Sequence, residues 1–198
     1  MYDDNKLLRF RKQKDDAWKH DASSPLTEEQ KKSFKGLNYF PPNPNLSFEL
    51  SLDRNIPNVD SQVVIKTTGG DEQIYLKAGK VKFTIAEKEV EALVFEDLEQ
   101  EQFQYYLLFR DQTTGKETYK NGRMLQIPKK GDTLIIDFNY AYNPYSSYND
   151  NWDCPITPEE NLSRQIILAI GMLTSIQLLQ VKAINTLTET LEESLKDD

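Results

Sequence analysis

Residues 63–76 read VVIKTTGGDEQIYL, in which two short apolar runs flank the turn sequence Gly69-Gly70-Asp71. Runs of β-branched and aromatic residues separated by such a turn predict a β-hairpin. The alternation of apolar and polar residues extends on both sides of this hairpin, from Phe48 to Phe138. The predicted strands cover residues 48–52, 63–67, 73–76, 81–85, 90–95, 105–109, 124–127 and 134–136.

These strands, about eight in number, are short and are joined by turn residues. No connection between them is long enough for the helical crossover that parallel strands need, so a parallel sheet is excluded. We therefore predict a mainly β fold of the α+β class, in which an antiparallel meander closes into a barrel or folds as a sandwich.

Two helices are expected before the strands. Residues 4–20 carry Leu7, Phe10, Ala17 and Trp18 on roughly one helical face, which is typical of an amphipathic helix. The segment from Thr27 to residue 30 then reads TEEQ, a capping box that predicts a short second helix ending near residue 36.

A long helix, or two shorter ones, is expected at the other end of the chain. Apolar residues recur there at spacings of three and four, and residues 172–198 carry Leu173, Ile176, Ile184, Leu187, Leu191 and Leu195. We expect a single β-rich domain over residues 1–171 and a helical extension over residues 172–198. Such an apolar stripe needs a partner surface, which is the β domain itself, a second copy of the chain or another protein. Of these we expect self-association, a homo-oligomer formed through this extension.

The composition excludes several classes of function. The chain has 198 residues, a net charge of −8 and a pI of about 4.9, which argues against nucleic-acid binding. Its single cysteine and single histidine cannot build a disulfide framework and are too few for an ordinary zinc site, so no metal or cofactor is expected. No signal peptide or membrane span is visible, which favours a cytoplasmic protein.

A polar segment at residues 110–123 joins two of the predicted strands. Asp111 and Thr113 fit a side-chain turn that closes the loop, or they contribute to a site. Tyr119 and Arg123 are large residues near the start of a strand, where they could point into the mouth of a barrel. We predict that Arg123 pairs with Asp111 or Asp137, because a carboxylate at the end of a buried strand needs a partner.

A second polar segment, residues 137–149, follows an apolar strand directly. Asp137 and Asn139 lie at the end of that strand on the same face, and Tyr142 and Asn143 come soon after. Four tyrosines in this segment are typical of a wall around a small polar ligand. Alternatively, their hydroxyl groups tie a long loop to the sheet.

A third segment, residues 154–161, reads CPITPEEN. Cys154 is expected to be a buried structural thiol, because the single histidine, His20, lies far away in the sequence on a surface-like helix. Thr157 and Glu160 form another candidate capping box, with Pro158 as the first helical residue.

These three segments, together with SSPL and FKGLNYFPPNP upstream, resemble the Domain of Unknown Function family 1684 over about residues 8–171. The resemblance implies a mainly β domain without an established activity. The positions that match the family's motifs are Asp111, Thr113, Gly115, Thr118, Tyr119, Gly122, Arg123, Asp137, Asn139, Tyr142, Asn143, Cys154 and Asn161.

The chain departs from that family in two places. Residues 145–147 are Tyr-Ser-Ser where relatives usually carry a cysteine, and residues 169–172 lack the glutamate with which the family typically ends. Chemistry that uses two cysteines is therefore lost. If the missing glutamate is catalytic in relatives, a binding or assembly role gains weight here.

Three functions remain open. The preferred one is a binding module for a small polar or anionic molecule, and the alternatives are an assembly protein that acts through the C-terminal helix and a hydrolase-type enzyme. The enzyme would use Asp137 or Asp111 for acid–base work, with Arg123 stabilising negative charge. The candidate ligand-binding residues are Asp111, Thr113, Tyr119, Arg123, Asp137, Asn139, Tyr142 and Asn143.

Overall fold

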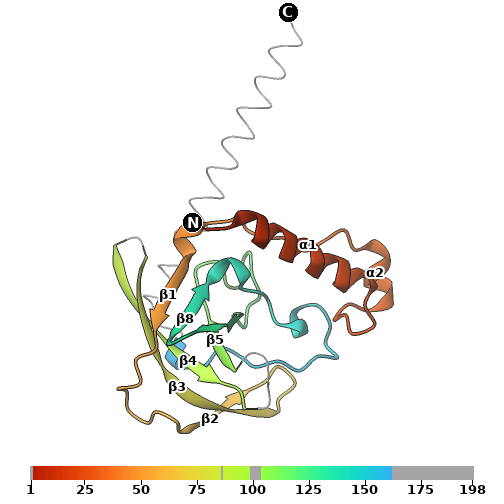
Figure 1. Cartoon of the computed structure of the whole chain (residues 1–198). Coiled ribbons are helices and arrows are strands. Elements are labelled where there is room, and N and C mark those ends of the chain that lie inside the picture. Colours follow the sequence, from red (N-terminus) through yellow and green to blue (C-terminus); the bar gives the residue numbers. More distant parts are fainter. Residues whose placement is uncertain (1, 86, 99–103, 162–198) are drawn as a thin grey trace, which may run out of the picture.

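The computed structural model describes residues 2–85, 87–98 and 104–161. It consists mainly of two antiparallel sheets, with the helices α1 (Asp4–His20) and α2 (Glu28–Ser33) packed along one side (Figure 1). The predicted mainly β fold is therefore confirmed. The expected extension over residues 172–198 lies outside the described residues.

The larger sheet is a meander in which sequence neighbours are also neighbours in space. Its strand order is β2-β3-β4-β5-β6, all antiparallel, and the sheet curls into a half-barrel (Figure 1). The strand pattern left a closed barrel and a sandwich open, and the structure has a half-barrel sheet together with a second, smaller sheet. Its strands are β2 (Gln62–Lys66), β3 (Glu72–Ile85), β4 (Lys88–Glu96), β5 (Tyr105–Phe109) and β6 (Arg123–Ile127).

One strand boundary was predicted wrongly. The segments 73–76 and 81–85 are not separate strands but parts of the long strand β3, which carries a bulge between Lys77 and Gly79. Gly79 permits a close approach rather than a turn, because a Cβ at this position would lie 2.7 Å from the carbonyl oxygen of Asp53. Asp53 in turn exchanges two backbone hydrogen bonds with Lys80.

The smaller sheet has the order β1-β8-β7, formed by β1 (Ser47–Ser51), β7 (Lys129–Lys130) and β8 (Thr133–Asp137). Together the two sheets enclose the main hydrophobic core. Phe138, which begins the short 3-10 helix η2 (Phe138–Tyr140), packs edge-on against Phe109 at a ring-centroid distance of 5.2 Å and lies 5.6 Å from Phe83. The core therefore fixes the chain immediately before Asn139.

The capping box of α2 is confirmed, because the Thr27 hydroxyl accepts from the Gln30 amide and Gln30 Oε1 accepts from the Thr27 amide. The buried side of α1 differs from the predicted one. The buried residues of α1 are Leu7, Arg11 and Trp18. Phe10 is 40% exposed, and its ring lies 4.9 Å from the ring of Tyr140, centroid to centroid.

Three further short 3-10 helices lie in the loops: η1 (Pro44–Leu46), η3 (Tyr145–Ser147) and η4 (Glu159–Asn161). The Thr157 hydroxyl donates to the carbonyl oxygen of Phe109. This hydrogen bond joins a loop to strand β5 and is not part of the capping box that was expected from Thr157 and Glu160. The side chain of the fully buried Asn161 accepts from the Leu93 amide and donates to the Leu93 carbonyl oxygen. It thereby satisfies the backbone groups of β4 that a neighbouring strand would otherwise bond. None of the helices in the described part of the chain is long and apolar enough to cross a membrane.

The first prediction concerns Gly122, which has a φ of +102° just before β6. A Cβ there would meet the Thr157 hydroxyl and would lie 2.7 Å from the carbonyl oxygen of Phe109. Gly115 has a φ of +78° but no atom within 4 Å of an added Cβ, which makes it a matched control. We expect Gly122→Ala to lower the free energy of unfolding by about 1 to 3 kcal/mol more than Gly115→Ala, measured by urea denaturation. Equal losses would contradict this packing.

Candidate functional site

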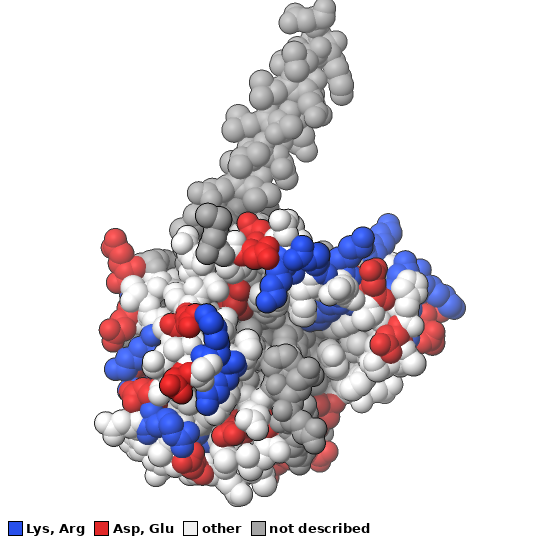
Figure 2. Space-filling view, in the orientation of Figure 1, with Lys and Arg blue, Asp and Glu red and all other residues white. Residues whose placement is uncertain are grey.

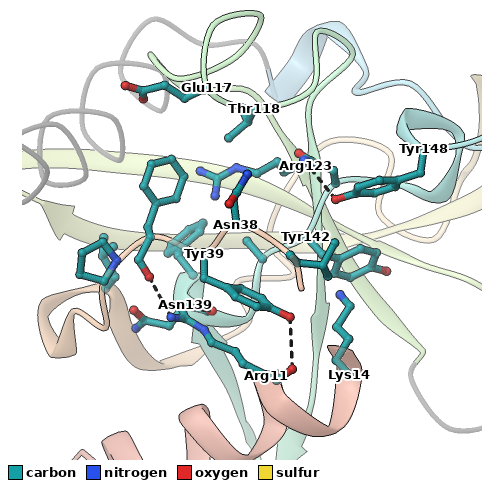
Figure 3. A pocket seen from close by; sticks show the side chains of 17 residues that line it. Arg11, Lys14, Asn38, Tyr39, Glu117, Thr118, Arg123, Asn139, Tyr142 and Tyr148 are labelled. Carbon is teal, nitrogen blue, oxygen red and sulfur yellow. Dashed lines mark hydrogen bonds between the residues drawn. The ribbon is translucent and has the colours of Figure 1, made fainter. Parts of the chain in front are cut away.

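A cavity of about 370 Å³ lies between α1, the segment 37–41, the start of β6 and the segment 138–143 (Figure 3). Side chains from α1 form one side of it, and Arg123 enters from the sheet side (Figure 3). The cavity therefore forms where the N-terminal helix packs on the β domain.

Arg123 is the first residue of β6 and is only 6% exposed. Its Nη2 donates to Asp111 Oδ2, which confirms the predicted ion pair and selects Asp111 over Asp137. Within the described chain no protein group bonds Nη1, and the guanidinium lies against the cavity (Figure 3). The protein thus holds one edge of Arg123 through Asp111, and no described residue bonds Nη1.

Asp111 and Thr113 position Arg123 and do not line the cavity. Asp111 is 3% exposed, and its Oδ1 accepts from both the amide and the hydroxyl of Thr113. Thr113 also shares a hydrogen bond with the hydroxyl of Thr118. The interpretation of these residues as a side-chain turn therefore accounts for their contacts.

Arg11 connects α1 to two loops. Its Nη1 donates to the carbonyl of Phe40 at 2.8 Å, and its Nη2 donates to the carbonyl of Asn139 at 3.1 Å. The guanidinium also lies 4.8 Å from the ring centroid of Tyr39. Because these contacts join segments from both sides of the cavity, Arg11 holds the helix in place and adds positive charge to the wall.

Lys14 is the third cation that lines the cavity. Its Nζ lies 4.7 Å from the ring centroid of Tyr142 and 5.3 Å from that of Trp18. No carboxylate of the described residues forms an ion pair with it. Burial lowers the pKa of Lys14 to about 8, although the neighbouring Asp15 acts in the opposite direction.

Asp15 is engaged elsewhere. Its Oδ1 accepts from the Tyr39 hydroxyl at 2.9 Å and from the Leu37 amide at 3.2 Å. These bonds hold the segment after α2 against α1, so the carboxylate next to Lys14 in the sequence supports the cavity wall.

Asn139 and Asp137 form a hydrogen-bonded support below the cavity. The Asn139 side chain exchanges two hydrogen bonds of 2.8 Å with the backbone of Asn43, and its Nδ2 also donates to Asp137 Oδ1. Asn139 lines the cavity, whereas Asp137 lines a separate hollow of about 760 Å³ beside β1 and β8.

Tyr142 and Asn143 complete the wall. Tyr142 exchanges two backbone hydrogen bonds of 2.9 Å with Met124, so the segment after η2 extends the sheet beside β6. Asn143 Oδ1 accepts from the Tyr119 amide, and its Nδ2 donates to the Tyr148 hydroxyl at 3.5 Å. The Tyr119 side chain does not line the cavity, and its hydroxyl accepts from Asn121.

The structure thus brings four of the predicted residues to one cavity: Arg123, Asn139, Tyr142 and Asn143. Sequence reasoning missed Arg11 and Lys14. The signal was their position, because residues 7, 11, 14 and 18 form one stripe of a helix and two of these four are cations. Asn38 and Tyr39 were also missed, whereas Tyr148 belongs to the group of four tyrosines that was expected to form a wall.

Cys154 lies apart from this cavity, buried in the wall of a hollow of about 610 Å³ on the other side of Tyr142. Its amide donates to the hydroxyl of Thr68. The expectation that its thiol is structural stays a prediction. Among the described residues, no group of three or more His, Cys, Asp or Glu side chains could hold a metal ion.

Fold and site together define a β-rich half-barrel domain with a cation-lined cavity beneath an N-terminal helix. The chain belongs to the family described as "Protein of unknown function (DUF1684)", whose model matches residues 32–169. Arg123, Asn139, Tyr142 and Asn143 fall within the matched range, whereas Arg11 and Lys14 precede it.

A solved structure with a similar fold is the solution NMR structure of an uncharacterized protein from gene locus rrnAC0354 of Haloarcula marismortui. It has 28% sequence identity and a TM-score of 0.60, and the match covers 80% of this chain and 87% of that one. No curated protein matches the chain.

The second prediction tests the buried ion pair. Asp111→Ala leaves Arg123 without its counter-charge, so we expect a loss of about 3 to 5 kcal/mol in the free energy of unfolding. The double variant Asp111→Ala/Arg123→Met removes both charges and is expected to be more stable than the single variant. Urea denaturation of the three proteins measures this difference, and a double variant less stable than Asp111→Ala would contradict the assignment.

The third prediction concerns Lys14. Its pKa is lowered from 10.5 to about 8 in the folded protein, so its charge destabilises the fold fully below pH 8 and progressively less between pH 8 and 10.5. Lys14→Met should therefore raise the free energy of unfolding by about 1 to 3 kcal/mol at pH 7 and by much less at pH 10.5.

The matched control for Lys14 is Lys12→Met, which removes the same charge from an exposed position of α1. Thermal unfolding of both variants is recorded from pH 6.5 to 10.5. A gain from Lys14→Met that does not change with pH, or one equal to that of Lys12→Met, would contradict the burial of the Lys14 ammonium.

Proposed function

We propose that this protein binds a small organic carboxylate in the cavity beneath α1. The observation that carries the proposal is Lys14, a largely buried ammonium group that lines the cavity and has no carboxylate partner among the described residues. Burying a charge is costly unless a counter-charge is supplied, and a bound anion supplies one.

The distribution of charge supports an anionic ligand. The whole chain has a net charge of −8, yet three cations line this cavity. Glu117 is the one acidic residue among its described lining residues, and its carboxylate points away from Arg123 and Lys14 (Figure 3). Lys and Arg side chains also gather on the surface over α1 (Figure 2), where they favour the approach of an anion.

The other lining groups support an organic ligand over an inorganic ion. Rings of Tyr39, Phe40, Phe138 and Tyr142 line the cavity and offer apolar surface. Its volume of about 370 Å³ falls within the range of small-molecule sites, which is roughly 300 to 1,000 Å³. The free Nη1 edge of Arg123 provides a donor for one carboxylate oxygen.

The alternative functions have less support. An acid–base enzyme would use Asp111 or Asp137, but Asp111 is engaged by Arg123 and Thr113, and Asp137 is bonded to Asn139 and faces a different hollow. Assembly through the C-terminal helix involves residues outside the described ranges.

The fourth prediction is that the protein binds small carboxylates such as benzoate, and that the affinity falls as pH rises through about 8 because Lys14 loses its proton. Burial raises the pKa of Tyr39, Tyr142 and Tyr148, so these groups stay neutral in this range. The charged or titratable groups that line the cavity with Lys14 are Arg11, Tyr39, Glu117, Arg123, Tyr142 and Tyr148. Asp15 is the charged group that acts on the pKa of Lys14.

Isothermal titration calorimetry with benzoate, from pH 6.5 to 9.5, measures this affinity. We expect Lys14→Met to weaken binding by about tenfold or more, and Lys12→Met to leave it nearly unchanged. Equal affinities of the two variants, or binding that tightens with rising pH, would refute the proposed site.

A further inference from the structure

Asp137 is a predicted site residue that the proposed carboxylate site does not use. It is the last residue of β8 and is only 7% exposed. Its Oδ1 accepts from the amide and from the side chain of Asn139, but no lysine or arginine of the described residues forms an ion pair with it. Arg11 acts on Asp137 electrostatically, yet its guanidinium donates to the backbone carbonyls of Phe40 and Asn139. A buried carboxylate without a bonded cation is costly, and a cationic ligand removes that cost.

Asp137 lines the hollow of about 760 Å³ beside β1 and β8. This volume falls within the range of small-molecule sites, which is roughly 300 to 1,000 Å³. Four aromatic rings line the hollow with it: those of Tyr2, Phe10, Phe48 and Tyr140. Phe10 is 40% exposed, and its ring lies 4.9 Å from that of Tyr140, so apolar surface is open to a ligand here. Aromatic rings attract cations over their faces.

The charges around this hollow leave Asp137 without a counter-charge. Two further acidic residues, Asp3 and Glu49, and two lysines, Lys6 and Lys130, also line it. Lys130 Nζ lies 2.9 Å from Glu49 Oε2, so these two charges offset each other. Asp3 and Lys6 occupy exposed positions, where water and salt screen their charges. Within the described lining, Asp137 is therefore the charge that is both buried and outside any ion pair.

The two tyrosines of the hollow add no charge of their own. Burial and the neighbouring carboxylate of Asp137 raise the pKa of Tyr2 and of Tyr140, so both hydroxyl groups are uncharged at neutral pH. Both rings are thus neutral walls close to the carboxylate.

We propose that the hollow beside β1 and β8 binds a small protonated amine with an aromatic body, whose ammonium group pairs with Asp137. The ammonium supplies the counter-charge and donates hydrogen bonds to the carboxylate, and the rings of the hollow cover the aromatic body. This site is independent of the cation-lined cavity beneath α1, because the two share none of their described lining residues. The two sites also take ligands of opposite charge.

Isothermal titration calorimetry of the full chain at pH 7 compares benzylammonium with benzyl alcohol, which has nearly the same shape and no charge. We expect an affinity for benzylammonium that is at least about tenfold higher than that for benzyl alcohol. Excess benzoate should leave the affinity for benzylammonium nearly unchanged. Equal affinities for the amine and the alcohol, or competition with benzoate, would overturn the proposal.

Three variants locate the site. Asp137→Asn keeps an oxygen that accepts from Asn139 and removes the charge, so it should weaken benzylammonium binding by about tenfold or more. The matched control is Asp16→Asn, which removes the same charge from an exposed residue of α1 outside the hollow and should leave binding nearly unchanged. Phe10→Ala removes a partly exposed ring and should weaken binding several-fold while the fold is kept.

Equal affinities of Asp137→Asn and Asp16→Asn, or full affinity of Phe10→Ala, would refute the amine site. Failure of benzoate to bind, with benzylammonium binding intact, would refute the carboxylate site alone.

Discussion

The docking of α1 on the β domain is the constraint on which the candidate site depends. Arg11 makes that contact, since its guanidinium donates to the carbonyls of Phe40 and Asn139 from one side chain. Backbone carbonyls in a buried position need donors, and a planar guanidinium can donate to two acceptors at once. The cavity between helix and sheet exists because this contact joins three segments far apart in the sequence.

The hydrophobic core and the site share one short segment. Phe138 packs against the rings of Phe83 and Phe109. The next residue, Asn139, accepts from the Asn43 amide with its side chain and from the Arg11 guanidinium with its backbone carbonyl. Arg123 is likewise fixed by Asp111 at the start of a core strand. Asn139 and Arg123 are thus held in place because their neighbours in the chain are buried in the core. The cavity wall therefore forms without a bound ligand.

Local patterns predicted the strands, the capping box at Thr27 and the pairing of Arg123 with Asp111, because period, turn chemistry and the need to pair a buried charge are properties of short segments. Local patterns did not predict the continuity of β3 through its bulge at Gly79, which depends on the close approach of a distant segment. They also did not single out Lys14, although it lies on the same stripe of α1 as Leu7, Arg11 and Trp18. Its burial follows from a loop folded over α1, and a stripe of one helix cannot reveal that loop.

Heteronuclear NMR of the full chain during a titration with benzoate shows most directly whether the cavity beneath α1 binds carboxylates, because it locates the ligand without altering any residue. We expect the largest changes in chemical shift on the walls of the cavity beneath α1, at Lys14, Arg123, Tyr142 and Asn143. Changes confined to the hollow around Cys154 or to the one beside Asp137, or no localised change at millimolar benzoate, would contradict it.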